Sequence, residues 1–180
     1  MARSSMRPLQ IEGESVRLRQ WCRGDFDFYS SFLCQEATAK HYGGKLNEAQ
    51  AWRHLASMIG HWELRGFGVW AVECSSDHGL IGCAGYWQPW DWDATELAFW
   101  FTEDAYEKGY PPEALEAVLE HACCFPEIGR VVCYIAPENR HARALVESMG
   151  AVATGTINLG DFGAHCAYDV LVDPAGKEST

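Results

Sequence analysis

Two apolar runs separated by a turn-forming segment place the strongest constraint on how this chain folds. Residues 68–73 and 80–86 are predominantly apolar and have the length of buried strands. The segment between them, residues 75–79, combines serine, aspartate and glycine, which favour tight turns. The pattern therefore predicts a β-hairpin, and a hairpin places its two strands antiparallel in a sheet.

Helical patterns alternate with further strand patterns along the rest of the chain. The clearest helix begins at a capping box of Asn47 and Gln50 and ends at Gly66. The other patterns predict helices near residues 25–33, 112–124 and 139–149, and strands near residues 15–20, 95–101, 130–135, 151–158 and 164–172. This order predicts a mixed α/β domain of the α+β kind, in which helices cover both faces of a central, mostly antiparallel sheet of six to seven strands.

The length and the ends of the chain favour one domain in the cytoplasm. A chain of 180 residues falls within the ~100–200 residues of a typical domain. No repeat or linker divides residues 1–180, so we expect a single domain with an ordered core of about residues 11–173. No run approaches the ~18 apolar residues of a membrane span, and residues 1–10 lack a secretion signal. We therefore expect a cytoplasmic protein without a membrane partner.

The charge of the chain argues against one class of partner. The net charge is −11 and the pI is about 5.0, and no run of basic residues is present. A nucleic-acid-binding face needs clustered lysine and arginine to neutralise phosphates, so we expect no nucleic-acid partner. An acidic surface attracts cations instead, among them amines.

The eight cysteines are scattered along the chain and mostly lie in apolar context. Free buried thiols have this distribution, whereas zinc ligands come at short fixed spacings. The sequence contains neither a Cys-x-x-Cys nor a His-x-x-x-His spacing. We therefore expect free thiols and no metal site.

The segment that carries chemistry is a strand near residues 95–101, followed at residues 106–114 by a glycine-containing turn that leads into the helix near 112–124. Free N–H groups and the helix dipole converge at a helix N-terminus and favour anions. Lys108 adds a local positive charge to this acidic chain. The pattern indicates an anion site, and a turn that holds Gly109 for structural reasons alone is the open alternative.

The order of several motifs resembles the GNAT superfamily, in the branch of the ribosomal-protein N-terminal-amine acetyltransferases. The resemblance runs from about residue 14 to residue 172 and covers most of the chain. The segments that carry it are Val-Arg-Leu-Arg-Gln-Trp at 16–21, Gly-Phe-Gly-Val-Trp-Ala-Val at 66–72, Leu-Ile-Gly-Cys-Ala-Gly at 80–85, Glu-Leu-Ala-Phe-Trp-Phe at 96–101, the turn at 106–114, Pro-Glu-Asn-Arg-His-Ala at 137–142 and Glu-Ser-Met-Gly at 147–150.

The resemblance implies acetyl-CoA as the co-substrate, held between the strand near 95–101 and the helix near 139–149. The residues that it implies for cofactor binding are Trp100, Phe101, Thr102, Lys108, Gly109, Tyr110, Pro111, Asn139 and Ala142. Asn139 also suits a helix N-cap, and both roles are compatible.

The turn before the helix departs from the pattern of the family. Glu107 stands where the family usually has its first glycine, and Pro111 stands where glycine or alanine is usual. Pro112 follows directly. Proline has no N–H, so two donors that would face a phosphate are missing. The N–H groups of Gly109 and Tyr110, with those of the next residues, are expected to replace them.

Acetyl transfer to an amine requires a base and favours an acid. Glu96 lies on the strand where many family members place a base, and burial near Trp100 would raise its pKa toward neutrality. A partly exposed glutamate paired with a lysine or arginine is the alternative. Ala142 stands where the branch often has a serine acid, so Tyr168 and Ser148 are the substitutes. A thiol with a pKa near 8.5 also leaves without an acid.

The sequence therefore predicts an N-acetyltransferase that moves acetyl from acetyl-CoA to a primary amine, a protein N-terminus or a small molecule, by direct attack. The tryptophan-rich loop at residues 87–92, with Trp52 and Trp62, is expected to wall the amine site, and an exposed hairpin that packs against a dimer partner is the open alternative. A non-catalytic member of the same fold that binds a ligand or a partner is the alternative, because the turn is altered. An enzyme that uses a longer acyl donor is a third hypothesis, and a homodimer is possible.

Overall fold

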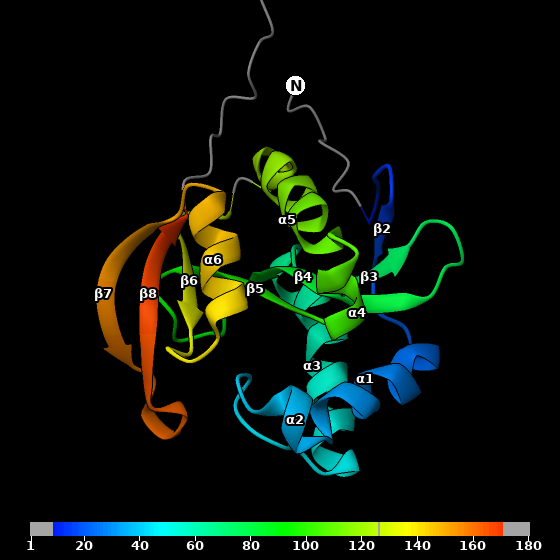
Figure 1. Cartoon of the computed structure of the whole chain (residues 1–180), viewed down its shortest axis with the longest axis horizontal. Helices are drawn as coiled ribbons and strands as arrows, with labels where there is room; N and C mark the ends of the chain where they lie inside the picture. The colour runs from blue at the N-terminus through cyan, green and yellow to red at the C-terminus, as the bar shows by residue number, and fades with distance from the viewer. Residues whose placement is uncertain (1–8, 126, 171–180) are drawn as a thin grey trace, which may run out of the picture.

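A computed structural model describes residues 9–125 and 127–170 as one layered α/β structure (Figure 1). Its strands are β1 (Gln10–Glu12), β2 (Val16–Arg19), β3 (Val69–Cys74), β4 (Leu80–Trp87), β5 (Thr95–Phe101), β6 (Val131–Ile135), β7 (Val152–Asn158) and β8 (Ala164–Val170). They form one sheet in the order β1-β2-β3-β4-β5-β6-β8-β7. All neighbours are antiparallel except β5 and β6, which are parallel.

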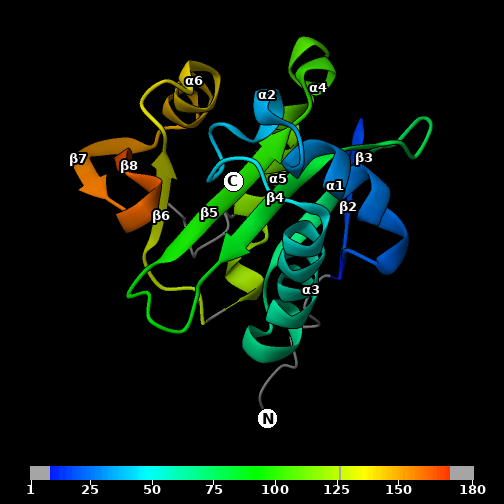
Figure 2. The same ribbon diagram turned by 90° about the horizontal axis from the view of Figure 1, so that it is seen from below.

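The helices are α1 (Phe26–Leu33), α2 (Glu36–Ala39), α3 (Glu48–Arg65), α4 (Glu103–Glu107), α5 (Tyr110–Glu120) and α6 (Arg140–Ser148). Helices α1, α2 and α3 lie on one face of the sheet, and α5 and α6 lie on the other (Figures 1 and 2). Within the two described ranges, no helix combines the length and the apolar character that crossing a bilayer requires.

The mixed, mostly antiparallel sheet with helices on both faces confirms the predicted fold class. The described sheet has eight strands, one more than predicted, because β1 also pairs with β2. With three residues, β1 is too short to give an alternating pattern. Residues 171–173 of the predicted ordered core, including the last two of the predicted strand near 164–172, lie outside the described residues.

The long helix α3 forms where its end signals predict it. The Asn47 side chain accepts a hydrogen bond from the Gln50 N–H, and the Gln50 side chain accepts one from the Asn47 N–H. Gly66 ends the helix in the left-handed conformation, with a φ of 76° that a side chain disfavours. The capping box and the glycine therefore fix both ends of α3.

Helix α5 differs slightly from its prediction. It begins at Tyr110, because Gly109 takes the left-handed conformation directly before it and Pro111 and Pro112 suit the first turn. It ends at Glu120, and residues 122–124 form a separate 3-10 turn. The predicted helix over 112–124 is therefore shifted toward the N-terminus.

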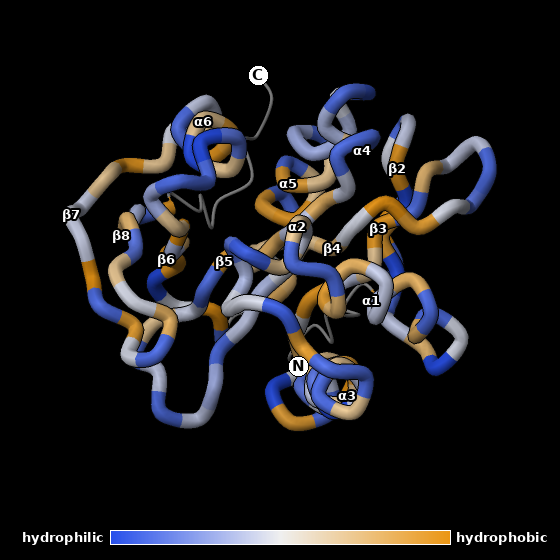
Figure 3. The backbone as a smooth tube through the Cα atoms, turned by 60° about the horizontal axis from the view of Figure 1, so that its bottom comes forward, coloured by the Kyte–Doolittle hydropathy of each residue, from blue (hydrophilic) through white to orange (hydrophobic). Residues whose placement is uncertain are grey.

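The apolar core packs most tightly between α5 and the centre of the sheet. Trp70, Tyr86 and Leu115 are fully buried there, and the Tyr86 hydroxyl donates a hydrogen bond to the Val118 carbonyl of α5 at 3.0 Å. Figure 3 shows the apolar residues concentrated along β3 and α5, whereas α4 is hydrophilic. A second cluster of buried side chains joins α1 and α3 to the opposite face.

The parallel strands β5 and β6 pair only at their beginnings. The paired residues are Thr95 with Val131 and Glu96 with Val132. Beyond them β5 stays paired with β4 as far as Phe101, and β6 stays paired with β8 as far as Ile135. The two strands therefore diverge after Glu96, as Figure 2 shows, and the backbone edges that face the gap have no strand partner within the described sheet.

Candidate active site

Glu96 lies where β5 and β6 begin to diverge, and it lines a cavity of about 260 Å³. Burial raises the pKa of its carboxyl from 4.5 to about 8, while a backbone hydrogen bond with Tyr134 acts in the opposite direction. A carboxyl with a pKa near neutrality is suited to accept and release protons at physiological pH. Glu96 is half-buried, and Trp100, near which the sequence predicted it, lines the same cavity.

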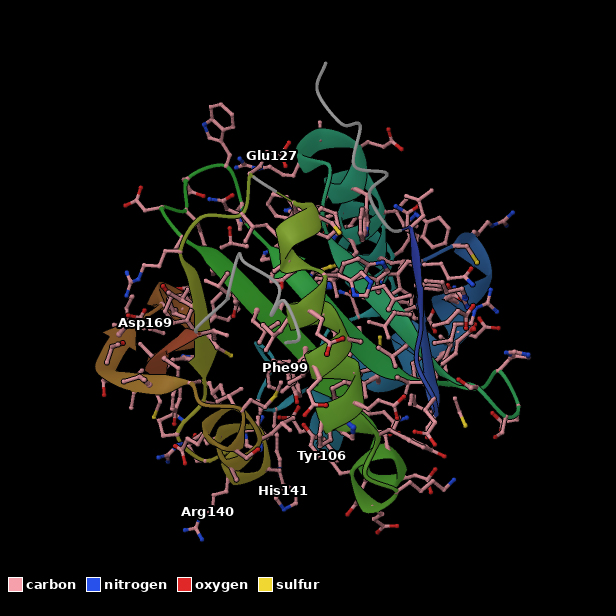
Figure 4. The ribbon with its side chains drawn as sticks, turned by 90° about the horizontal axis from the view of Figure 1, so that it is seen from above. Phe99, Tyr106, Glu127, Arg140, His141 and Asp169 are labelled. Atoms are coloured by element: carbon pink, nitrogen blue, oxygen red, sulfur yellow. The ribbon has the colours of Figure 1, made fainter. Side chains whose placement is uncertain are left out.

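A larger groove, of about 990 Å³, runs between α6 and the turn that joins α4 to α5. Gly109, Pro111 and Glu107 line it on one side, and Arg140 and His141 line it on the other. Figure 4 shows Tyr106 of α4 next to His141 of α6, and their ring centres are 5.8 Å apart.

The cavity and the groove meet at three residues that line both: His41, Tyr42 and Asn139. Burial raises the pKa of Tyr42 to about 12, and a hydrogen bond with Asn139 partly offsets the effect of burial. The Tyr42 hydroxyl therefore stays protonated at neutral pH. Two molecules, one in the groove and one in the cavity, would come together at this junction.

Asn139 begins helix α6 and faces the junction. Its side-chain oxygen accepts a hydrogen bond from the Ala142 N–H at 3.2 Å, so the predicted N-cap role is present in the structure. Ala142 is buried and lines the cavity but has no hydroxyl to offer. Both residues therefore shape the site from the β6 side of the gap.

The turn before α5 holds fewer free donors than the sequence predicts. The Gly109 N–H, expected to face a phosphate, donates instead to the Tyr106 carbonyl at 3.2 Å. The Lys108 ammonium lies 2.9 Å from the Asp104 carboxylate, and the ion pair is exposed to solvent. Because Pro111 and Pro112 have no N–H, Tyr110 supplies the only backbone N–H among the first three residues of α5.

The structure places the predicted cofactor-binding residues in two groups. Phe101, Gly109, Pro111 and Asn139 line the groove, and Trp100, Asn139 and Ala142 line the cavity. Thr102, Lys108 and Tyr110 line neither. Thr102 caps α4 by accepting a hydrogen bond from Ala105, and the Tyr110 hydroxyl lies 3.5 Å from the Cys74 sulfur, which donates to it.

Tyr168, predicted as an acid, is not brought to Glu96. Its side chain is buried under α6, where its hydroxyl accepts a hydrogen bond from the Arg143 guanidinium at 3.0 Å and donates one to Glu147 at 2.7 Å. Tyr168 lines neither the cavity nor the groove. The other substitute, Ser148, lines the groove, but its hydroxyl donates to the Leu145 carbonyl at 2.7 Å.

The aromatic wall of the cavity differs in part from the predicted one. Trp87 and Trp92 line the cavity, whereas Trp90 is 93% exposed and its ring lies 5.9 Å from the Arg65 guanidinium outside the cavity. Trp52 packs against Phe26 on the surface, and Trp62 is buried beside Trp70 in the α5-side core. Side chains that the sequence did not indicate take their places: Trp21, Tyr29, His54, Phe162 and His165.

Tyr29 and His54 lie on helices that the sequence predicted, but the missed loop residues lie on segments without a distinctive pattern. His41 and Tyr42 follow the four-residue helix α2, and Phe162 lies in the short 3-10 turn between β7 and β8. The available signal was a pair of glycines, Gly43 and Gly44, both in the left-handed conformation that marks a tight loop. The sequence shows that a loop is present there, but not which strands the loop covers.

The cavity and the groove meet beside the gap between β5 and β6, and such an arrangement suits a protein that brings two molecules together for reaction. Residues 15–152 match the family described as acetyltransferase (GNAT) domain. The chain therefore belongs to the GNAT family of acetyltransferases, as the order of its motifs predicted.

Solved structures share the fold over nearly the whole chain. An acetyltransferase from Agrobacterium tumefaciens has a TM-score of 0.77 at 22% identity, with 89% of this chain and 92% of that chain covered. RimL, a ribosomal α-N-protein acetyltransferase, in complex with coenzyme A, has a TM-score of 0.74 at 15% identity, with 94% and 99% covered. A Salmonella typhimurium acetyltransferase that modifies the N-terminal serine of a 50S ribosomal subunit protein has a TM-score of 0.73 at 15% identity, with 89% and 97% covered.

Proposed function

We propose that this protein transfers an acetyl group from acetyl-CoA to a primary amine by direct attack of the amine on the thioester. The observation that carries the proposal is the meeting of the groove and the cavity at His41, Tyr42 and Asn139, with Glu96 lining the cavity. The groove has the size for an extended donor, and the smaller cavity suits the amine. Family membership supports acetyl transfer as the reaction.

The groove has features that fit coenzyme A. Lys40 and Arg140 supply positive charge to its lining, although Glu103, Glu107 and Glu138 line it as well. The Tyr106 hydroxyl faces that of Tyr42 and is buried without a hydrogen bond of normal geometry, so it is available to a bound molecule. The unpaired edges of β5 and β6 offer backbone donors and acceptors to the amides of an extended arm.

The proposed reaction uses Glu96 as the base. The neutral amine attacks the thioester carbonyl, and a C–N bond forms. Ionised Glu96 accepts the proton that the nitrogen loses, the C–S bond breaks, and the electron pair goes to sulfur. In this proposal the hydroxyl of Tyr42, which lines both the cavity and the groove, donates a hydrogen bond to the departing sulfur, and the sulfur then takes a proton from solvent. A thiolate of pKa near 8.5 needs no stronger acid.

A second candidate function is non-catalytic ligand binding on the same fold. The turn before α5 favours it, because the Gly109 N–H is already bonded and Pro111 and Pro112 have none. Acetyl transfer requires that the protein binds acetyl-CoA and consumes it, whereas non-catalytic ligand binding does not.

Titration calorimetry of acetyl-CoA into the native protein, followed by an assay of CoA thiol release with primary amines, tests the proposal. We expect micromolar binding and amine-dependent release, with Glu96→Gln binding the donor normally but releasing the thiol more slowly. If the native protein fails to bind acetyl-CoA, acetyl transfer is refuted and the non-catalytic function stands.

A further inference from the structure

The walls of the cavity beside Glu96 are predominantly aromatic. Its lining includes nine large aromatic side chains: Trp21, Tyr29, Tyr42, Trp87, Trp92, Phe99, Trp100, Tyr134 and Phe162. Trp100 is held rigidly, because its ring stacks on Phe32 with the ring centres 3.9 Å apart. Rigid aromatic walls favour a flat apolar group that stacks against them.

The charges of the lining limit what else enters. Among the described residues that line the cavity, Glu96 has the only carboxyl group, and the basic side chains are the histidines His41, His54 and His165, without a lysine or an arginine. A polyamine would bring further ammonium groups without a second carboxyl group to meet them, and an amino acid would bring a carboxylate without a lysine or an arginine to meet it. The charge pattern therefore fits a molecule with one amine and no acid.

The size of the cavity limits the body of the amine. Its volume of about 260 Å³ lies just below the ~300–1,000 Å³ common for ligand sites. Over the cavity, Phe162 lies so close to Gly43 that a Cβ atom on Gly43 would be 2.7 Å from the phenyl ring. The loop that holds Gly43 and the turn that holds Phe162 thus meet in the cavity wall, and the small volume disfavours a continuing peptide chain.

One polar group in this wall has no partner in the protein. The indole N–H of Trp21 makes no hydrogen bond, although the residue is only 4% exposed. A buried donor of this kind is usually satisfied, and the face of a bound aromatic ring is a weak acceptor for an N–H group. The Tyr29 hydroxyl, by contrast, already has a partner in His54 at 2.6 Å.

From these observations we infer that the acceptor is a small arylalkyl monoamine, with a flat aromatic body between the tryptophans and its single amine at Glu96. This inference rests on the proposed acetyl transfer. It goes beyond that proposal by excluding polyamines, amino acids and peptide N-termini as the preferred acceptors. The aromatic walls hold the body, and the meeting of the cavity with the groove brings the nitrogen to the thioester.

The test measures CoA thiol release with a panel of acceptors at equal concentration. We expect kcat/KM for tryptamine and 2-phenylethylamine to exceed the values for spermidine, tryptophan and a serine-initiated peptide by at least tenfold. A preference for spermidine, tryptophan or the peptide overturns the inference while leaving acetyl transfer intact.

A pair of variants ties the preference to the cavity. Phe162→Ala removes a wall residue that is itself 62% exposed, so the fold is expected to tolerate it. It should raise KM for tryptamine at least fivefold and leave KM for ethylamine unchanged. Trp90→Ala, at a tryptophan outside the cavity, is the matched control and should change neither value. Equal effects of the two variants overturn the inference.

A separate measurement decides the inference if no amine is acetylated. In that case acetyl transfer fails, and calorimetry of tryptamine and spermidine without a donor reports on the cavity alone. Tryptamine binding that Phe162→Ala weakens supports an aryl-amine site on a non-catalytic protein. Absence of tryptamine binding, or tighter binding of spermidine, overturns it.

Discussion

Replacing Glu96 by glutamine should change the pH dependence of both rate and stability through one group. The pKa of Glu96 is about 8 in the folded protein. At pH 7 only about one molecule in ten then carries the ionised base, and at pH 9 about nine in ten do. If Glu96 is the base, kcat/KM should rise about tenfold between these pH values because of this group alone.

The acceptor amine also loses its proton in this range and contributes a slope of its own. That slope is common to the native protein and to Glu96→Gln, because the variant leaves the amine unchanged. The ratio of the two kcat/KM values across pH 6 to 9.5 therefore isolates Glu96. We expect the ratio to rise with pH and to level off above a midpoint near 8.

The free energy of unfolding should fall as pH rises, whereas kcat/KM should increase. A carboxyl whose folded pKa exceeds its unfolded pKa stabilises the fold fully below the unfolded value and loses that contribution as pH rises through the folded value. For Glu96 the window runs from pH 4.5 to about 8. At about 1.4 kcal/mol per pH unit the loss is at most about 5 kcal/mol, and Glu96→Gln avoids it.

Urea unfolding of both proteins at pH 5 and pH 9 measures this difference. The variant should gain stability relative to the native protein as pH rises, by a few kcal/mol at pH 9. Parallel stability curves would show that Glu96 is not held in a raised-pKa environment. A constant rate ratio with diverging stability curves would remove Glu96 from the mechanism while keeping its burial.

Three further changes test other parts of the structure. Pro111→Ala restores a backbone N–H donor at the start of α5. The variant should bind acetyl-CoA about tenfold more tightly by calorimetry, because a hydrogen bond to a charged group contributes ~1.5–3 kcal/mol. An unchanged affinity would show that the phosphates bind elsewhere. Asp25→Ala removes two hydrogen bonds of 2.8 Å from the Arg19 guanidinium, which keeps its ion pair with Glu73 at 2.6 Å. The variant should destabilise the fold by about 1.5–3 kcal/mol in urea, whereas a loss under about 0.5 kcal/mol would mean that solvent replaces the pair. Gly85→Ala places a Cβ atom 2.4 Å from the Gly68 carbonyl oxygen, so it should lower the melting temperature by at least 10 °C, and an unchanged value would show that β3 moves aside.

The sequence predicted the parts of the fold that carry strong local signals. The capping box of Asn47 and the terminal Gly66 set α3, and the apolar runs around the turn at 75–79 set the hairpin of β3 and β4. The elements that it missed, β1, α2 and α4, have three to five residues each. Such short segments hold their structure through tertiary contacts, which leave no periodicity in the sequence.

Among the residues of the candidate site, those on regular elements were predicted and those on loops were missed. Glu96 and Asn139 were predicted because they belong to regular elements that the family motifs mark. Tyr42 and Phe162 were missed, because loops bring them to the gap from distant parts of the chain. Tyr168 was predicted from its strand, but its direction toward α6 depends on the register between β6 and β8. A cytoplasmic location and a homodimer stay predictions.

Because β5 and β6 pair over only two residues each, the backbone hydrogen bonds of the sheet fall into two blocks. One block contains β1 to β5, and the other contains β6, β8 and β7. On the α5 face, a continuous apolar core still joins the two blocks. The blocks therefore communicate through side-chain packing more than through the main chain, and each can open locally with its own free energy. A molecule that bridges the gap would add a direct mechanical link. We expect amide hydrogens in β4 and β8 to exchange independently in the free protein and as one cooperative unit when such a molecule is bound.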